Sequence, residues 1–556
     1  MPKLLAALLC AFAAAHAQRP LPAAGTISGV VKDAGSGAPI PNASVEASGW
    51  SASGGPTPSA ITDVEGRYKL FNLPPGRVSV KVTVAAGTAR RSVTLGAGQD
   101  VTGIALAPSL RGIIAGKVVD EFNDRVTGVC VTAINRTYRQ GVLQSIYHGS
   151  VGITNDKGEY RIRVPSSAAV LVLAQQNGAA TADVGAIQRG LRPIAEAPYD
   201  PKLRKQVLAP SYYPGANSVD GAEAITLRSG EVREGVDIRI TRGPSYCAEG
   251  TIEWNGAPAA MGFWFSAARV HRGYGTYNPE PMARTGLDGR FRICDLSPGE
   301  YTVSAHHDSP GPRIPDNGSL TFRIADKDVS NLSVVVHPSA DLTGEIAWDV
   351  TNPAEAPQVE VLMMLYPLAG AAVSSVRAAA PGSFKIEGIP PQDYEVRAYA
   401  RPPGFDTKTT SFYVKEVTYG GASVLHELMH MGAAMGNDGL HVLVANDGAS
   451  LSGRLADRDG GGVQDSYIVL LPAAAETASA IAKSMLTTDT DQNGAFGWDT
   501  LPPGKYLAMA MHTAPVLTPE FMARVIQMRS EATPVELAPK SAVNLRLVPL
   551  AGSSVR

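Results

Sequence analysis

One five-residue segment of the chain has the spacing of a catalytic metal site. His426-Glu427-Leu428-Met429-His430 is an H-E-x-x-H sequence. On a helix its two histidines would lie one turn apart and bind zinc, while the glutamate would act as a general base. Leu, Met, Glu and Ala dominate residues 425–435, so local propensity permits a helix there. The segment therefore raises the hypothesis of a zinc peptidase.

The other parts of a zinc peptidase site are missing from the sequence. The extended form H-E-x-x-H-x-x-G-x-x-H needs glycine and histidine where this chain has Ala433 and Gly436. His441 would be a third ligand only through the folding of a neighbouring strand. We therefore expect no catalytic residues, no metal and no other cofactor, and we keep His426 and His430 as the zinc candidates of the alternative hypothesis.

An acidic segment near the C-terminus resembles the first half of a calcium-binding loop. It reads Asp489-Thr490-Asp491-Gln492-Asn493-Gly494, but its twelfth position is Thr500 instead of the bidentate glutamate that calcium needs. Two similar segments occur elsewhere, at residues 62–66 and 154–158. We interpret all three as hairpin turns in which Asp or Asn side chains bind their own backbone, and calcium is the alternative.

These segments belong to an internal repeat. An aromatic residue follows a turn, and ten positions later another aromatic or aliphatic residue follows a proline- and glycine-rich corner, in the pairs Tyr68/Val78, Tyr160/Val170, Phe291/Tyr301, Phe384/Tyr394 and Phe496/Tyr506. Each copy also opens with a short strand around a glycine, at Gly29, Gly116, Gly250, Gly344 and Gly453. The copies recur every 90 to 130 residues or so, which is the size of a whole domain.

Composition supports an all-β fold. The chain has 556 residues with 57 Gly and 41 Pro, and short runs of Val, Ile, Leu and Thr separate its turns. We predict a tandem array of about five Ig-like or prealbumin-like antiparallel β-sandwich domains. Their expected boundaries are 25–107, 110–242 with an insertion at 176–217, 243–337, 338–447 and 448–549. Because the linkers are short, we expect a long rod with limited bending.

The insertion at residues 176–217 interrupts the second copy with several prolines and then Tyr212-Tyr213-Pro214-Gly215. Tyrosine-proline-glycine segments of this kind resemble those of large exported multi-repeat proteins. We interpret the insertion as a structural loop packed over a sheet edge, and a ligand-contacting loop is the alternative.

The recurring residues resemble a known family, the carboxypeptidase regulatory-like domains. Gly29 to Asp33, Thr62 to Tyr68 and Leu73 to Val78 follow its pattern G-x-V-x-D, T-D-x-x-G-x-Y and L-P-P-G-x-Y, with Val78 in place of the final aromatic. The resemblance implies a transthyretin-like β-sandwich related to the Cna B-type modules of bacterial surface proteins. It implies no catalytic residues, because the family is named for an accessory domain that lies beside a peptidase.

The N-terminus carries the signs of an export signal. Lys3 precedes an apolar run from Leu4 to Ala15, and Ala15-His16-Ala17 is an A-x-A cleavage sequence, so residues 1–17 are expected to be a signal peptide. No later apolar stretch approaches the roughly 20 residues of a transmembrane helix. The formal net charge is -2, which gives no electrostatic footprint for nucleic acid or anionic membrane. We expect a periplasmic, outer-surface or extracellular protein.

Export would place the mature chain in a compartment where disulfides form. Cys247 and Cys294 fall in one predicted domain, and we favour a disulfide between them over two buried free thiols. Cys130 lies in the strand Val129-Cys130-Val131, where it is expected to pack as a small apolar residue.

Three classes of function compete. We favour a non-catalytic scaffold or binding protein of the cell envelope, with a protein or glycan partner at the cell surface. The second class is an array of carbohydrate-binding modules using exposed indoles, for which the candidates are Trp50, Trp254, Trp264, Trp348 and Trp498; the alternative for each is core packing. The third is the zinc peptidase, which requires a formed helix and a third ligand.

Overall fold

In the computed structural model the repeats fold as β-sandwiches, and we refer to them as repeats 1 to 5. The structure describes residues 23–549 apart from 50–56, 86, 140, 167, 177–205, 255, 259–262, 270–282, 286–287, 307–315, 351–358, 368–372, 402–411, 433–438 and 513. The predicted signal peptide therefore lies outside the described residues, as does most of the insertion. Among the described residues, no helix combines the length and the apolar composition needed to cross a bilayer.

Repeat 1 shows how residue alternation builds each sandwich. Along one strand Tyr68, Leu70 and Leu73 are buried while Lys69 and Phe71 face solvent. The two sheets have the strand orders β4-β1-β7 and β3-β2-β5-β6, and they enclose one apolar core. The strands are β1 Gly25–Val31, β2 Ser44–Ser48, β3 Ser59–Ile61, β4 Arg67–Leu73, β5 Gly76–Val84, β6 Gly87–Leu95 and β7 Asp100–Leu106.

Repeats 2 and 3 repeat this plan and share a small sheet in which β13 pairs with β17. The elements of repeat 2 are β8 Gly112–Val119, β9 Val129–Arg139, β10 Val142–Ile153, β11 Glu159–Val164, β12 Leu171–Gln176, β13 Gln206–Ala209, β14 Ser211–Tyr212, η2 Val219–Gly221, β15 Val232–Arg233 and β16 Ile238–Arg239. Those of repeat 3 are β17 Thr241–Pro244, β18 Tyr246–Trp254, β19 Ala257–Pro258, β20 Trp264–Arg269, β21 Ala283–Arg284, β22 Arg290–Leu296, β23 Gly299–His306, β24 Asn317–Ile324 and β25 Val329–Val336.

Repeats 4 and 5 complete the chain, and each has its own core. Repeat 4 contains β26 Ala340–Asp349, β27 Val359–Pro367, β28 Ser374–Ala380, β29 Gly382–Ile389, β30 Asp393–Arg401, β31 Tyr413–Tyr419, β32 Ala422–Ser423, β33 Met429–His430 and β34 Leu440–Ala445. Repeat 5 contains β35 Ala449–Leu455, β36 Tyr467–Pro472, α3 Ala478–Ser484, β37 Leu486–Asp489, β38 Ala495–Leu501, β39 Gly504–Met511, α4 Pro519–Met528, η5 Arg529–Glu531, β40 Thr533–Leu537 and β41 Ala542–Leu547.

The opening glycine of each repeat is required by a close backbone approach. A Cβ atom on Gly29 would lie 1.7 Å from the carbonyl oxygen of Ile104 in the last strand, and one on Gly453 would lie 2.3 Å from that of Leu545. The same glycine always faces the first aromatic residue of its repeat across the sheet, in the pairs Gly29/Tyr68, Gly116/Tyr160, Gly250/Phe291, Gly344/Phe384 and Gly453/Phe496. The glycine therefore leaves room for both the carbonyl and the ring.

Each repeat also buries one phenol from its aromatic pair. In repeats 1 and 2 the first residue is tyrosine, and its hydroxyl donates to the last part of the repeat, Tyr68 to Ile104 O at 3.0 Å and Tyr160 to Val236 O at 2.6 Å. In repeats 3 to 5 the second residue is the tyrosine, and its hydroxyl donates to the corner four residues earlier, at 2.8, 2.7 and 2.8 Å, in the pairs Tyr301/Ser297, Tyr394/Pro390 and Tyr506/Pro502. The buried phenol therefore fixes the last part of the repeat in repeats 1 and 2, and it fixes the proline-rich corner in repeats 3 to 5.

Repeat 5 adds a helical layer that the strand pattern does not predict. Thr477 and Thr518 cap α3 and α4 by accepting hydrogen bonds from the backbone of the first turn. Helix α4 turns Met522, Val525 and Met528 inward, onto residues of β36 and β39 that point away from the sandwich core. Repeat 5 therefore has apolar packing on both faces of this sheet.

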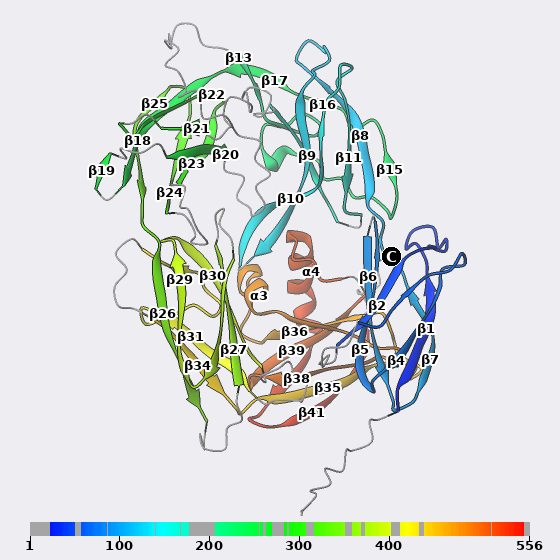
Figure 1. Cartoon of the computed structure of the whole chain (residues 1–556). Coiled ribbons are helices and arrows are strands. Elements are labelled where there is room, and N and C mark those ends of the chain that lie inside the picture. The colour runs from blue at the N-terminus through cyan, green and yellow to red at the C-terminus, as the bar shows by residue number, and fades with distance from the viewer. Residues whose placement is uncertain are drawn as a thin grey trace, which may run out of the picture.

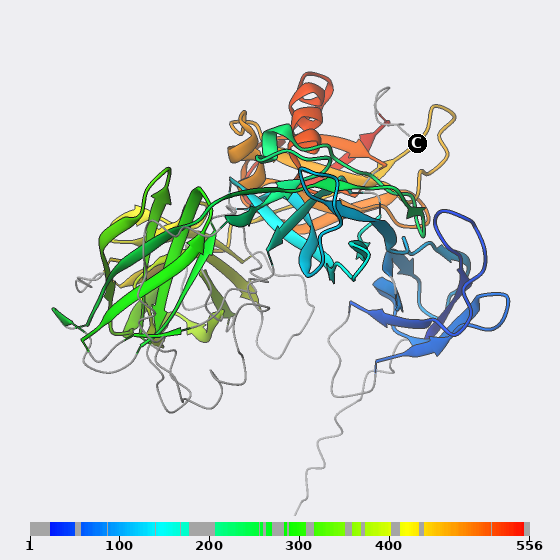
Figure 2. The same ribbon diagram turned by 90° about the horizontal axis from the view of Figure 1, so that it is seen from above.

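The chain closes on itself instead of forming a rod. Figure 1 shows the five repeats arranged in a circuit, with α3 and α4 toward its middle, and Figure 2 shows the same arrangement from above. Repeat 5 contacts repeats 1, 2 and 4 through hydrogen bonds that span up to 418 positions of sequence. The expectation of a long rod is wrong, because repeat 5 carries a polar turn and a helical layer that both contact earlier repeats.

Candidate functional site

The H-E-x-x-H segment does not form a helix. Residues 425–428 make a bend that leads into strand β33, where His430 pairs with Asp393 of β30. The Nδ1 atom of His430 lies 2.8 Å from the Asp393 carboxylate, and His426 is exposed in the bend. The strand pairing of Met429, which is fully buried in the core of repeat 4, fixes the backbone in the extended form.

Glu427 has a structural partner in another repeat. Its two carboxylate oxygens accept hydrogen bonds from the Lys483 ammonium of α3, at 2.6 and 2.5 Å. His441 lies in β34, on the other sheet of repeat 4. Among the described residues, no group of three or more His, Cys, Asp or Glu side chains is placed to hold a metal ion. The segment joins repeat 4 to repeat 5, and it does not assemble the geometry that a zinc site requires.

The acidic turn forms a hairpin that uses its own carboxylates. Asp491 Oδ1 accepts hydrogen bonds from the backbone N–H groups of Asn493 and Ala495, both at 2.8 Å. Asp63 and Asn155 do the same in repeats 1 and 2. These contacts engage Asp491, which would be the third position of the calcium loop, and they favour the interpretation as a hairpin turn.

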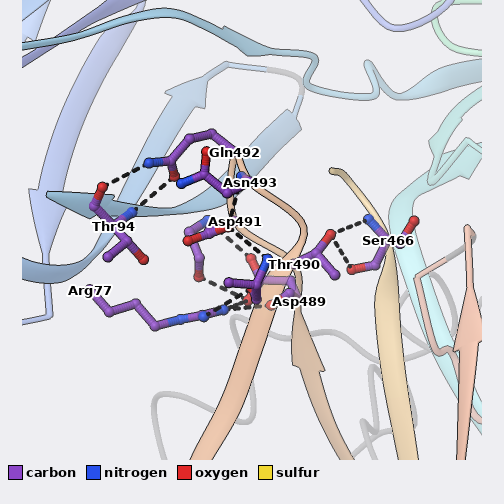
Figure 3. A network of polar contacts seen from close by, with 10 residues as sticks. Arg77, Thr94, Ser466, Asp489, Thr490, Asp491, Gln492 and Asn493 are labelled. Atoms are coloured by element: carbon purple, nitrogen blue, oxygen red, sulfur yellow. Dashed lines mark hydrogen bonds and ion pairs between the residues drawn. The ribbon is translucent and has the colours of Figure 1, made fainter. Parts of the chain in front are cut away.

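The same turn binds repeat 1 through the residues that differ between copies (Figure 3). The side-chain amide of Gln492 accepts from Thr94 N at 3.0 Å and donates to Thr94 O at 2.7 Å. Asp489 accepts from the backbone N–H of Ser92 at 3.0 Å and from its hydroxyl at 2.9 Å. Arg77 of β5 donates to the backbone carbonyl of Asp489, and its guanidinium also lies 3.4 Å from the Asp489 carboxylate.

A second ion pair strengthens this contact. Arg91 of β6 pairs with Asp465, which precedes β36 of repeat 5. Gln492 and Asp489 of the turn, together with Asp465, thus place two carboxylates and one amide against strands β5 and β6. We call this surface the repeat 1–5 contact, defined on one side by Arg77, Arg91, Ser92 and Thr94 and on the other by Asp465, Asp489 and Gln492.

Repeat 2 reaches repeat 5 through a long hairpin made by β9 and β10. Tyr138 packs against the apolar layer under α3 and α4, and its backbone N–H donates to Leu517 O at 2.7 Å. The Thr137 hydroxyl donates to the same carbonyl at 3.1 Å. This contact is partly apolar, unlike the repeat 1–5 contact.

The tip of that hairpin also contacts repeat 4. Arg139 Nε lies 3.0 Å from a carboxylate oxygen of Glu395, which is only 1% exposed and also pairs with Arg397. The centre of the Tyr366 ring lies 5.6 Å from the guanidinium carbon of Arg139 and 4.8 Å from that of Arg397. A buried carboxylate compensated by two arginines holds repeats 2 and 4 together.

The tryptophans that the structure describes pack within their own repeats. Trp254, Trp348 and Trp498 are half-buried and lie 6.0, 5.1 and 6.3 Å from a phenylalanine ring of the same repeat, in non-parallel orientations. Trp50 and the side chain of Trp264 lie outside the described residues. The three indoles support the core-packing interpretation, and they form no coplanar exposed platform for a sugar.

The described part of the insertion has a structural role. Tyr212 of β14 is buried with Ile134, Leu171 and Leu173 on the outer face of the sheet of repeat 2. Residues 177–205, where a ligand-contacting loop would lie, are outside the described part.

The cysteines in the described part of the chain are one disulfide pair and one free thiol. Cys247 and Cys294 form a disulfide in repeat 3, with Cα atoms 4.0 Å apart. Cys130 is a buried free thiol, and burial raises its pKa to about 11. A thiol with a raised pKa and no access to solvent is unreactive, so Cys130 acts as a packing residue.

Repeat 1 matches a protein family. Residues 26–107 match the family model of the carboxypeptidase regulatory-like domain. No curated protein matches the chain.

Several solved structures align with parts of the chain at low overall similarity. A streptococcal ancillary pilin is 11% identical, with a TM-score of 0.19, and the alignment covers 57% of this chain and 99% of that one. The minor pilin of Streptococcus agalactiae is 12% identical, with a TM-score of 0.22, and covers 40% and 97% of the two chains. Two B repeat units of the collagen-binding protein of Staphylococcus aureus are 11% identical, with a TM-score of 0.12 and coverage of 76% and 100%.

Proposed function

We propose that this chain is an exported, non-catalytic scaffold or binding protein of the cell envelope. The observation that carries the proposal is that the side chains most suited to chemistry are engaged in structural contacts. Glu427 and Asp489 join repeat 5 to repeats 4 and 1, and His430 pairs with Asp393. A catalytic group has to reach a substrate, whereas Glu427 and Asp489 hold repeats together and His430 is paired within repeat 4.

Five sandwiches of about 100 residues present long loops and sheet edges on a stable frame. We propose that each repeat is an independently folding domain with the boundaries expected from the sequence, because each has a separate apolar core. Loops and sheet edges on such a frame are the usual binding surfaces of β-sandwich proteins. A protein partner is favoured over a glycan, because the three described indoles are used for packing.

The absence of catalysis is tested with wild-type protein and the Glu427→Gln variant. We expect less than one-tenth of a zinc ion per chain by elemental analysis, and no cleavage of a mixed peptide substrate by either protein. The variant should unfold within about 1 kcal/mol of the wild type, because the Glu427 side chain is 61% exposed and its ion pair with Lys483 is a surface contact. One zinc ion per chain, with peptide cleavage that Glu427→Gln abolishes, would overturn the proposal.

Export is tested separately by the mass of the protein that leaves the cytoplasm. Cleavage after Ala17 predicts a mature chain that begins at Gln18. Replacing Ala15 and Ala17 by bulky residues should leave the signal peptide attached, since the cleavage site requires small side chains. Full-length protein retained in the cytoplasm of wild-type cells would contradict export.

A further inference from the structure

Strand β6 is an edge strand, and its outward backbone groups are capped by side chains of repeat 5. The sheet order β3-β2-β5-β6 leaves one side of β6 without a neighbouring strand among the described residues. On that side, Ser92 presents its N–H and Thr94 presents its N–H and C=O, two residues apart, as in any sheet edge. All three groups are bound by Asp489 or Gln492.

Gln492 binds Thr94 in the way that a strand would. Its amide accepts from Thr94 N at 3.0 Å and donates to Thr94 O at 2.7 Å, which reproduces the paired hydrogen bonds of two opposite residues in an antiparallel sheet. Asp489 supplies the next acceptor along the edge, to Ser92 N. Repeat 5 therefore occupies, with side chains, the place where the main chain of another strand would add.

The repeat 1–5 contact is polar, whereas the contact between repeats 2 and 5 is partly apolar. It consists of hydrogen bonds and ion pairs, and the side chains of Arg77 and Asp489 keep 35% and 25% of their exposure. The contact between repeats 2 and 5 instead inserts Tyr138 into an apolar cluster. Exposed polar contacts contribute little net stability and weaken with salt, so the repeat 1–5 contact should open more readily than the contact between repeats 2 and 5.

The charge of this edge selects the occupant. Strand β6 carries Arg90 and Arg91, and on β5 Lys81 lies opposite Arg90 and Arg77 lies opposite Thr94. Antiparallel pairing with β6 of a second copy would place arginines of the two chains opposite each other when it centres on Arg90 or Arg91, and like charges across a sheet are destabilising. The residues that now cover the edge include the carboxylates of Asp465 and Asp489. An acidic segment is therefore the complementary occupant.

We propose that β6 is a docking edge for an extended acidic peptide segment of a partner protein, and that repeat 5 closes this edge in the free chain. The segment adds as a further strand, makes main-chain hydrogen bonds to Ser92 and Thr94, and places its carboxylates beside Arg77 and Arg90, which share one face of the sheet. This inference rests on the proposed binding function and names the partner's chemistry. Docking and closure compete, so the affinity that is measured equals the affinity of the open edge reduced by the open fraction.

The test measures binding of a fluorescein-labelled eight-residue peptide of alternating threonine and glutamate by fluorescence anisotropy. The full mature chain is compared with the Asp489→Ala, Gln492→Ala double variant, which removes the caps and leaves β6 intact. We expect the double variant to bind at least tenfold more tightly than the wild type. A peptide with lysine in place of glutamate should bind neither protein, and a peptide N-methylated at alternate residues should lose its binding to the double variant.

A substitution on strand β6 tests whether the peptide binds through main-chain hydrogen bonds to that strand. Adding Thr94→Pro to the double variant removes one outward N–H, at an edge position where proline is tolerated, and should abolish peptide binding. If the double variant does not fold, the single Gln492→Ala variant at constant salt replaces it, with proteolysis in the linker at residues 107–111 reporting release of repeat 1. An opened chain that ignores the peptide would overturn the proposal.

The other outcomes are also decisive. Equal affinity of the double variant and the wild type would show that repeat 5 does not close the edge. Concentration-dependent dimers of the double variant without peptide would assign the edge to a second copy of the chain. Cleavage of the peptide would overturn the proposed non-catalytic function instead, so the two proposals fail in different ways.

Discussion

Replacing Tyr394 by phenylalanine tests whether a repeat depends on the buried phenol of its aromatic pair. The Tyr394 side chain is 1% exposed. Its hydroxyl donates to Pro390 O at 2.7 Å and accepts from the Gln392 side chain at 3.2 Å. The variant keeps the ring and loses only the oxygen, so the core volume barely changes. What changes is the hydrogen bonding of the buried Leu-Pro-Pro-Gly type corner, here Ile389-Pro390-Pro391-Gln392.

The expected cost follows from the two bonds. Each contributes about 1 kcal/mol net, and a buried carbonyl left without a donor adds to the loss, so we expect repeat 4 to lose about 2 kcal/mol of stability. That corresponds to roughly 30-fold faster amide exchange in strands β27 and β30, if both open with the unfolding of this repeat. Hydrogen exchange read by mass spectrometry localises the effect to these strands and requires no separation of the repeats.

Tyr399→Phe is the matched control, since Tyr399 lies on the same strand and is 46% exposed. It removes the same atom, and it should change exchange by less than about 0.5 kcal/mol. Equal effects of the two variants, or an effect of Tyr394→Phe spread evenly over all repeats, would refute the reasoning. The corner would then be held by its prolines alone.

Three further predictions concern pH, thiols and the opening glycine. Burial raises the pKa of Tyr394 to about 12. The neutral hydroxyl therefore stabilises the fold fully below about pH 10, and this stabilisation is lost as the pH rises toward about 12. In alkaline unfolding followed by circular dichroism, Tyr394→Phe should lose less stability over this pH range than the wild type. Mature protein unfolded without reductant should expose one thiol to Ellman's reagent, that of Cys130, and three after reduction, since the other two are paired; three thiols without reductant would exclude the disulfide. Gly344→Ala should cost about 3 kcal/mol or more in thermal unfolding, because its Cβ would lie 2.1 Å from Phe384 Cζ, while Gly432→Ala, with open space around it, should be nearly neutral.

The sequence predicts the sandwiches because their determinants are local. A glycine, a turn and a proline-rich corner at fixed offsets specify which strands pair, and the structure pairs Gly344 with Phe384 as it pairs Gly29 with Tyr68. The hairpin turn at Asp491 was predictable for the same reason, since its hydrogen bonds reach only two and four residues along the chain. The family match of residues 26–107 agrees with the resemblance that these residues indicate.

The arrangement of the repeats was not predictable, because it depends on pairs with no local signature. The contact of Gln492 with Thr94 spans 398 positions, and neither residue is unusual for an exposed turn or an edge strand. The sequence gives one weak indication of the contact, because the turn of repeat 5 has Gln492 at the position where repeats 1 and 2 have Val64 and Asp156. The helices α3 and α4 had a clearer one, because Thr518-Pro519-Glu520 followed by Met522 and Val525 has the form of a capped amphipathic helix.

Because repeat 5 contacts repeats 1, 2 and 4, the circuit of repeats can close only after repeat 5 has been synthesised. Domains fold from the N-terminus as the chain is made, so four sandwiches exist before the one that joins them. Until it arrives, the β6 edge of repeat 1 and Tyr138 of the repeat 2 hairpin have nothing to bind, and an uncovered strand edge invites pairing with a neighbouring chain. A chain that stops before residue 448 would keep the cores of repeats 1 to 4, but its β6 edge would stay uncovered. Such a truncated chain should aggregate more readily than the full-length chain.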